Sequence, residues 1–273
     1  MLKSPVFSFA AAAALAVTSA TLMAQWPDHP SKGVPKGEDG KPNLAAPPPR
    51  TADGKVDFSG LWENLRIGGP AKGEPQSDPP AATFANIGAG FKDGLPLRPW
   101  AAELLKQRKD SISKDNPDAH CLPMGLMQLH MHPQPRKIVQ LPELIVMMYE
   151  GNSGLRQIFM DGRPLPPPDV DPWWYGYSIG KWDGDTLVVE TTRLRDLGWL
   201  DINGSPITED GKLIERYRRP TFGSLEIEVT VDDPKAYTKP FTVKVSQRIM
   251  LNTDLIEFIC AENERDAPHL VGK

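Results

Sequence analysis

The sequence predicts a mainly β fold: an antiparallel, calycin-like barrel or a strongly curved sheet, with one short helix and an extended N-terminal leader. Two observations support this fold class. Eight or nine short segments have the alternation or the β-branched composition of strands, and no helix of crossover length separates them. Because parallel strands need such crossovers, antiparallel pairing is expected, and this many strands tend to close or stack to protect their edges.

The first 56 residues are expected to lie outside the globular part. Residues 1–24 contain an early lysine, an alanine-rich apolar segment and small residues near their end, which is the order of a secretory signal peptide. Residues 25–56 are rich in Pro, Gly, Lys and Asp, and this predicts a disordered or extended leader. We therefore expect one β-rich domain over residues 57–273, in a periplasmic or secreted protein without stable membrane insertion after signal cleavage.

The domain is expected to begin with a strand and then a helix. In "VDFSGLWE", Val56, Phe58 and Trp62 suit a strand, and Gly60 suits a bend. The segment "LRPWAAELLKQRKDSISKD" is the best candidate for a helix, because Pro99 fits a first helical turn and basic residues gather towards its end.

The later strands follow one another closely. "RKIVQL", "LIVMMYE" and "LRQIFM" are predicted strands, and two extended runs flank the hairpin-like "WDGD" in "WYGYSIGKWDGDTLVVETTRL". Alternation is clearest in "SLEIEVTVDD" and "FTVKVSQRI", which predicts that each is a strand with one face exposed to solvent. "LIEFICAEN" is expected to end the series of strands.

The two cysteines, Cys121 and Cys260, are the only ones in the chain. In an exported protein an even pair favours a disulfide over two reduced thiols, although two separate buried thiols are the alternative.

Methionine and histidine are concentrated in "CLPMGLMQLHMHPQP", residues 121–135. Thioether and imidazole groups suit Cu(I), and in an extended backbone His130 and His132 would project to the same side, with Met124 and Met127 completing the coordination. Methionine also forms adaptable linings for apolar ligands and fills gaps in cores. Copper is thus the one cofactor that the sequence suggests, and packing is the competing interpretation.

The aromatic run "DPWWYGYSIGKW" is the second concentration. Several aromatic rings with tyrosine hydroxyls form a plausible platform for a ring-bearing or sugar-like ligand, whereas an ordinary barrel core is the alternative. The candidate ligand-binding residues are Trp173, Tyr175, Tyr177, Trp182, Met127 and Arg156.

Four charged residues are candidates for catalysis. Asp161 and Arg163 lie at a predicted turn, while Asp201 and Glu215 could act as acid or base if they face a cavity. For each of them a solvated or salt-bridged position is the alternative. The sequence contains no nucleophile elbow, metalloprotease, paired-cysteine or phosphate-loop motif.

Several phrases together resemble a broad group of uncharacterised secreted bacterial proteins: "DFSGLWE", "CLPMG", "KIVQLPELIVMMYE", "RQIFMDGRPLP", "YSIGKWDGDTLVVETT" and "LEIEVTVDDPKAYTKPFTV". The resemblance covers the chain from about Asp57 to the C-terminus. It implies an exported, β-rich protein in which both cysteines belong to the fold, and it implies no reaction.

Composition narrows the range of functions. The chain carries a formal net charge of −4 and no dense run of Lys and Arg, which argues against nucleic acid as a partner. We expect a protein that binds a small apolar or aromatic molecule in a barrel-type cavity. The alternatives are a lyase, isomerase or hydrolase that acts on such a molecule by acid-base chemistry, and a periplasmic copper-binding protein.

Overall fold

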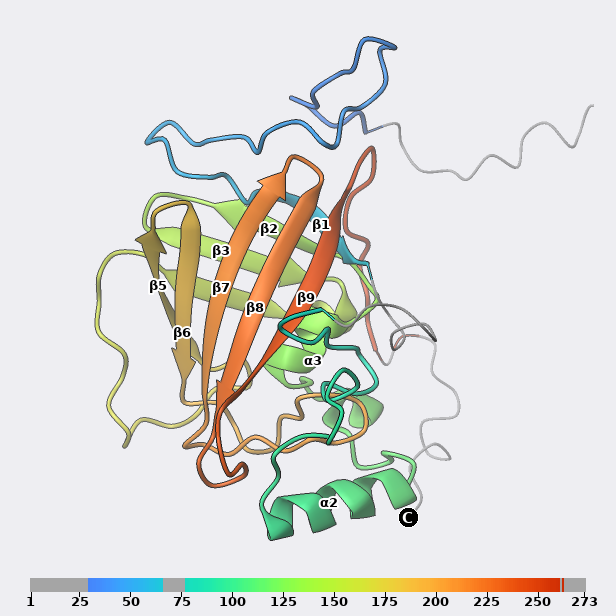
Figure 1. Ribbon diagram of the computed structural model, residues 1–273, viewed down its shortest axis with the longest axis vertical. Coiled ribbons are helices and arrows are strands. Elements are labelled where there is room, and N and C mark those ends of the chain that lie inside the picture. The colour runs from blue at the N-terminus through green and yellow to red at the C-terminus, as the bar shows by residue number, and fades with distance from the viewer. Residues whose placement is uncertain (1–28, 66–76, 261, 263–273) are drawn as a thin grey trace, which may run out of the picture.

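Nine strands form a closed barrel in the computed structural model, which describes residues 29–65, 77–260 and 262 (Figure 1). The mainly β prediction is thereby confirmed. In chain order the strands are β1 Gly60–Asn64, β2 Arg136–Gln140, β3 Leu144–Tyr149, β4 Leu155–Phe159, β5 Tyr177–Asp183, β6 Thr186–Thr192, β7 Lys212–Thr221, β8 Ser224–Asp232 and β9 Phe241–Met250. Each strand pairs with its neighbour in the chain, and β9 pairs with β1 to close the barrel.

One pairing differs from the expected antiparallel pattern. β4 and β5 run parallel, because residues 160–176 carry the chain back along the barrel before β5 begins. This pairing has two residue pairs in register, Ile158 with Ser178 and Phe159 with Ile179, whereas β7 and β8 share eight. The barrel wall therefore has few paired residues between β4 and β5, and we call this boundary the β4–β5 seam.

Two strand assignments need correction. The segment 255–260 is not a strand, since the barrel is already closed and its edges are all paired. β7 is a long strand that the sequence did not predict. Its buried residues are Leu213, Glu215, Tyr217 and Arg219, so charged groups replace the apolar residues whose alternation would have marked it.

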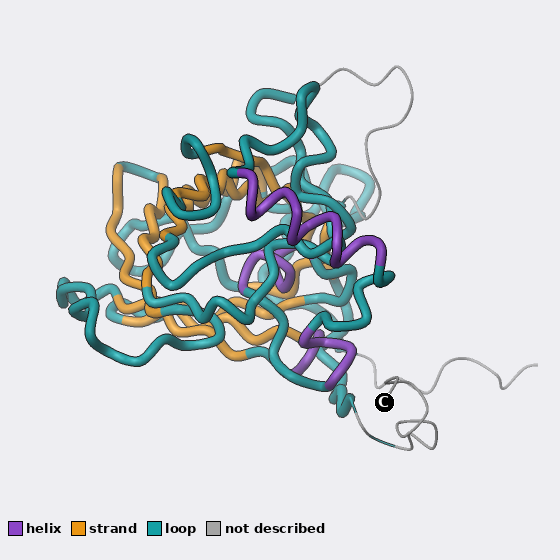
Figure 2. Tube along the Cα trace, turned by 90° about the horizontal axis from the view of Figure 1, so that it is seen from below, coloured by secondary structure: helices purple, strands orange, loops and turns teal. Residues whose placement is uncertain are grey.

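The helices lie at one end of the barrel (Figure 2). α2, Pro99–Asp110, is the predicted helix, with Pro99 at its start and Arg108 and Lys109 in its last turn. The shorter α3, Leu126–Met131, replaces the extended backbone expected around His130. Every residue of α3 is buried, so this helix plugs the barrel end. Two short 3₁₀ helices, η2 Pro117–His120 and η3 Gly151–Ser153, flank it.

The described part of the leader, residues 29–56, crosses the opposite end of the barrel (Figure 1). Backbone hydrogen bonds from Phe222 to Ala46 and from Gly223 to Leu44 fix it to the β7–β8 turn. Arg50 forms a two-bond ion pair with Asp185. Contacts with the barrel hold this segment, which turns repeatedly and forms two isolated bridges within itself, Lys36 with Pro42 and Arg50 with Val56. The predicted signal peptide, residues 1–24, lies outside the described residues.

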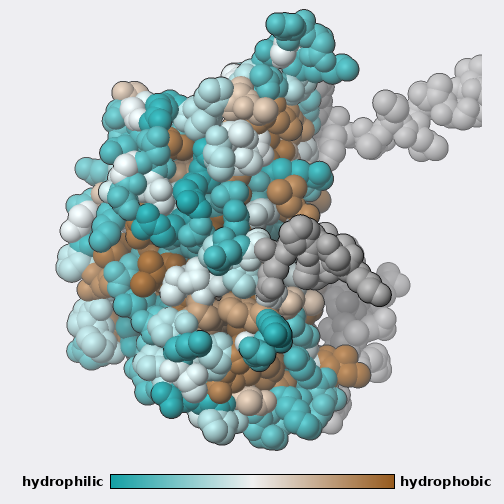
Figure 3. All heavy atoms as spheres, in the orientation of Figure 1, coloured by the Kyte–Doolittle hydropathy of each residue, from teal (hydrophilic) through white to brown (hydrophobic). Residues whose placement is uncertain are grey.

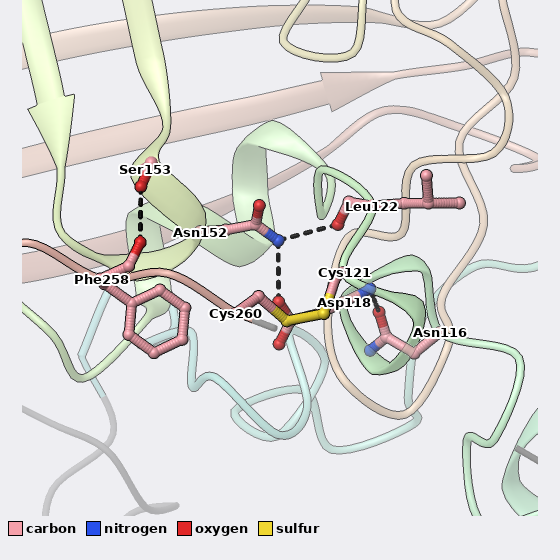
Figure 4. The surroundings of a disulfide bond; sticks show 8 residues. All are labelled: Asn116, Asp118, Cys121, Leu122, Asn152, Ser153, Phe258 and Cys260. Atoms are coloured by element: carbon pink, nitrogen blue, oxygen red, sulfur yellow. Dashed lines mark hydrogen bonds between the residues drawn. A yellow bond between two sulfur atoms is a disulfide. The ribbon is translucent and has the colours of Figure 1, made fainter. Parts of the chain in front are cut away.

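The predicted disulfide between Cys121 and Cys260 is present (Figure 4). It fastens the segment after β9 to the loop that follows η2. Nearby, the Asn152 side-chain amide donates to Asp118 Oδ1 and to the Leu122 carbonyl, both at 2.8 Å. None of the helices in the described ranges combines the length and apolar character needed to cross a bilayer.

Candidate functional site

A buried ion pair lies inside the barrel. Arg156 on β4 and Glu215 on β7 have side-chain exposures of 1% and 0%, and Arg156 contacts both carboxylate oxygens of Glu215. The bond from Nη1 to Oε1 is 3.0 Å long. Because both strands alternate, the side chain of each residue points inward at this level of the barrel. The interior is therefore polar at its centre.

His130 approaches this pair from α3. Its Nε2 lies 2.8 Å from Glu215 Oε1, and its Nδ1 lies 3.2 Å from the Tyr149 hydroxyl. This network assigns the proton to Nε2, which donates to Glu215, while Tyr149 donates to Nδ1. Both ring nitrogens are consequently occupied.

Hydroxyl groups complete the network. Tyr217 donates to Glu215 Oε1 at 2.7 Å. Arg156 donates from Nε to Ser178 at 3.1 Å and from Nη2 to Thr191 at 2.8 Å. A buried charge pair is tolerated when its remaining hydrogen-bonding groups are satisfied in this way.

A second buried arginine fixes α3 in place. Arg136 on β2 donates from Nη1 to the His130 carbonyl at 2.6 Å and from Nη2 to the His132 carbonyl at 2.8 Å. Asn64 on β1 donates to the same two carbonyls. Carbonyls at the C-terminal end of a helix lack helical partners, and a cation there is favourable. These contacts hold the His130 ring at the height of Glu215.

The protonation states follow from burial and charge. Burial alone raises the pKa of Glu215, but the Arg156 guanidinium and the His130 hydrogen bond outweigh it and hold this pKa well below its usual range. Burial lowers the pKa of His130 more than its bond to Glu215 raises it. The pKa of Tyr149 rises to about 12, chiefly because of burial. At neutral pH the network therefore holds one carboxylate, one guanidinium and a neutral imidazole.

An aromatic pocket opens on the wall beside this network, at the β4–β5 seam. This seam pocket has a volume of about 420 Å³, and its main apolar walls are Leu155, Phe159, Trp173, Trp174, Tyr175 and Tyr177. Arg156 and Ser178 of the interior network also line it. The pocket thus adjoins the interior ion pair where the wall has fewest hydrogen bonds.

Three rings of the seam pocket pack together: Tyr177 stacks on Phe159 and lies tilted against Trp173. The ring centroids of Phe159 and Tyr177 are 5.1 Å apart, and those of Trp173 and Tyr177 are 5.4 Å apart. Trp173 is 41% exposed, so this group offers aromatic surface to a ligand. The guanidinium of Arg163 covers the outer side of Phe159 at 3.8 Å.

Gly176 sets the path of the chain into the pocket. Its φ is +67°, and a Cβ there would lie 2.5 Å from Thr191 Cγ2 and 2.9 Å from the Thr192 carbonyl oxygen. Only glycine fits this conformation and this space. Tyr175, before the bend, makes no hydrogen bond through its hydroxyl to any described residue, and burial raises its pKa. Its hydroxyl is therefore a neutral donor available to a ligand.

The expected ligand-binding residues are divided among three places. Trp173, Tyr175, Tyr177 and Arg156 line the seam pocket together. Trp182 points inward at the other end of the barrel, stacks on Phe58 at 5.8 Å, and lines a pocket of about 270 Å³ under residues 51–55. Met127 is 1% exposed in the core. Trp173, Tyr175 and Tyr177 do not share one strand face, because β5 begins only at Tyr177, whose side chain points outward.

The four candidate catalytic residues have different surroundings. Glu215 is the centre of the interior network. Asp161 and Arg163 pair with each other at the surface, and Arg163 also donates to the Tyr177 hydroxyl at 3.2 Å. Asp201 accepts hydrogen bonds from Ile87, Gly204 and Ser205, so it organises loops outside the network. The structure brings none of the other three into contact with Glu215.

The two histidines proposed for copper also have separate surroundings. Since α3 is helical, positions two residues apart do not share a side, and the His132 ring packs edge-on against Phe84 at 4.9 Å. Met124 and Met127 are core residues with 1% exposure each. The described residues contain no group of three or more His, Cys, Asp and Glu side chains arranged to hold a metal ion.

Sequence reasoning missed four members of the network: Tyr149, Ser178, Thr191 and Tyr217. For Tyr149 a signal existed, because it lies two residues after Met147 on a predicted strand and therefore shares its face. No protein-family model matches the chain, and no curated protein matches it.

Proposed function

We propose that this exported protein binds a small, ring-bearing apolar or aromatic molecule in the seam pocket. The observation that carries the proposal is the closely packed, partly exposed group of Phe159, Trp173 and Tyr177 along one wall of a concave pocket. Pockets of this kind take ligands through apolar rings and a few polar groups that fix orientation. Tyr175 supplies one such group. The disulfide supports the export, because such bonds persist in oxidising compartments.

Fluorescence titration with N-phenyl-1-naphthylamine, an uncharged two-ring probe, tests this proposal. We expect saturable binding by the wild-type protein and about tenfold weaker binding by Trp173→Ala, because a lost ring contact costs roughly 1 to 1.5 kcal/mol. Trp100→Ala is the matched control, since Trp100 is 46% exposed on α2 and does not line the seam pocket. It should bind as the wild type does.

Two results would overturn the proposal. One is no binding of the probe by the wild-type protein. The other is equal binding by the Trp173→Ala and Trp100→Ala variants. If Trp182→Ala weakens binding while Trp173→Ala does not, the ligand site lies instead in the pocket under residues 51–55.

Acid-base turnover of the bound molecule is the second candidate function. It is favoured by Arg156 and Ser178, which line the seam pocket while bonding within the network of Glu215. Binding alone is better supported, because Glu215 and His130 have exposures of 0% and 1%. Glu215→Gln separates the two functions: a binding protein keeps its affinity for the probe, whereas an enzyme loses turnover of its substrate.

A further inference from the structure

A second depression lies along α2, next to the seam pocket. This α2 groove has a volume of about 530 Å³, and its principal walls are Leu104, Arg108, Leu122, Trp174, Leu197 and Trp199. Leu197 is 55% exposed and Leu122 is 46% exposed. In Figure 3 hydrophobic residues gather in the lower part of the face shown, the part where Figure 1 places α2.

The groove and the seam pocket adjoin each other. Trp174 lines both of them, and the consecutive residues Leu122 and Pro123 line the groove and the pocket respectively. A ligand with one ring in the seam pocket can therefore extend past Trp174 into the groove. The disulfide lies beside this junction, at Cys121.

Arg108 gives the groove a positive charge. Its guanidinium carbon lies 4.4 Å from the Trp199 ring centroid, and its Nη1 donates to the Gly204 carbonyl at 2.8 Å. No carboxylate of the described residues lies within 4.0 Å of it. Burial lowers the pKa of Arg108 to about 10, which leaves it charged at neutral pH.

Gly204 fixes the position of the Arg108 side chain. A Cβ at Gly204 would lie 2.6 Å from Arg108 Cδ, so the arginine stem packs directly on this glycine. Three acids, Asp201, Asp115 and Asp196, act on Arg108 and raise its pKa against the effect of burial. Asp115 is exposed and also lines the groove, whereas Asp201 accepts hydrogen bonds from its own loops. A second guanidinium, that of Arg195, lies 5.2 Å from the Trp174 ring.

We infer that the α2 groove binds the anionic group of an extended, ring-bearing ligand, and that Arg108 is the residue that holds this group. The inference rests on the proposed function, because the ring portion occupies the seam pocket. The chemical class is an aromatic or other ring-bearing acid, a carboxylate or sulfonate. A planar guanidinium beside aromatic rings suits such a group, because charge-assisted hydrogen bonds strengthen where water is partly excluded.

A pair of probes that share their rings tests this inference. 1-Anilinonaphthalene-8-sulfonate carries the ring system of N-phenyl-1-naphthylamine and adds a sulfonate. The quantity measured is the ratio of their dissociation constants for each protein. We expect Arg108→Gln to weaken sulfonate binding about tenfold or more relative to the wild type, while binding of the uncharged probe stays within about twofold.

Arg98→Gln is the matched control. Arg98 is exposed just before α2 and has no carboxylate within 4.0 Å among the described residues, but it does not line the groove. Its variant should keep the wild-type ratio. Arg108→Lys retains the charge and should recover part of the preference for the sulfonate, and denaturation midpoints of all variants check that each is folded.

The outcomes separate this inference from the function on which it rests. If the wild type fails to bind the uncharged probe, the proposed function is wrong. If it binds that probe but Arg108→Gln leaves the ratio unchanged, the inference alone is wrong. An equal loss of sulfonate binding in Arg98→Gln also overturns it, because the effect would then be that of surface charge in general.

Discussion

The buried pair of Arg156 and Glu215 yields a prediction about stability. Replacing Arg156 by Met keeps most of the volume and removes five hydrogen bonds: two to Glu215 and one each to Ser178, Thr191 and Tyr217. Glu215 then keeps Tyr217, His130 and a long bond from Thr191 as partners, at a position with 0% side-chain exposure. Because an uncompensated buried charge is costly, we expect the free energy of unfolding to fall by about 3 to 5 kcal/mol.

The matching double variant tests the reason for that loss. In Arg156→Met/Glu215→Leu the unpaired carboxylate is gone as well, so the double variant should lose clearly less stability than the two single variants added together. Urea unfolding followed by circular dichroism gives each free energy, with the slope compared among variants to check for a common denatured state.

A control at Arg216, which follows Glu215 on β7, distinguishes the effect of burying a charge from the effect of removing one. Arg216→Met breaks the exposed ion pair with Asp183, which has side-chain exposures of 44% and 65%. Its unfolding midpoint should shift little, because solvent screens such pairs. The reasoning fails if Arg156→Met costs no more than this control, or if the double variant loses the full sum of the two single variants.

Two further predictions concern acid and reductant. Burial lowers the folded-state pKa of His130 and His132, so their contribution to stability is complete above the unfolded pKa of about 6.5 and is lost as pH falls below it. The urea midpoint of the His130→Gln variant should therefore drop less between pH 7.5 and pH 5 than that of the wild type. The variant His120→Gln, at an exposed position, should show the wild-type drop. Equal drops in the two variants would contradict this reasoning. Reduction of the Cys121–Cys260 bond, which spans 139 residues, should lower stability by about 4 to 5 kcal/mol in the chain-entropy model. It should also weaken probe binding, since Pro123, two residues after Cys121, lines the seam pocket. An unchanged midpoint in reductant would exclude a stabilising bond.

Strands with one apolar face could be predicted from the sequence, and those with a polar interior row could not. In β8, Leu225, Ile227, Val229 and Val231 are all buried, and their alternation marks the strand directly. In β7 the inward row contains Glu215 and Arg219, so hydrophobic alternation fails where the barrel interior is polar. Glu215, one of the two residues that hide the strand from the sequence, is the centre of the interior network.

The site residues needed long-range information that the sequence does not contain. Arg156 and Glu215 are 59 residues apart, and His130 reaches Glu215 only because α3 enters the barrel end. "LMQLHM" is too short for its helical period to be distinguished from an extended apolar run. The grouping of the aromatic run, by contrast, could be predicted because local sequence alone places its rings together, although their strand faces could not be assigned before the start of β5 was known.

The location of the seam pocket follows from the topology. An antiparallel pairing of full length would cover the wall with hydrogen bonds and side chains, but the parallel β4–β5 pairing has two residue pairs, and Gly176 bends the chain away below them. Inner residues Arg156 and Ser178 and outer residue Tyr177 therefore line one pocket, which a regular wall would separate. A ligand held there contacts aromatic surface, while the side chains of Arg156 and Ser178 stay buried behind the wall with exposures of 2% and 1%. The crossover that makes β5 parallel is thus the structural feature that creates the proposed binding site.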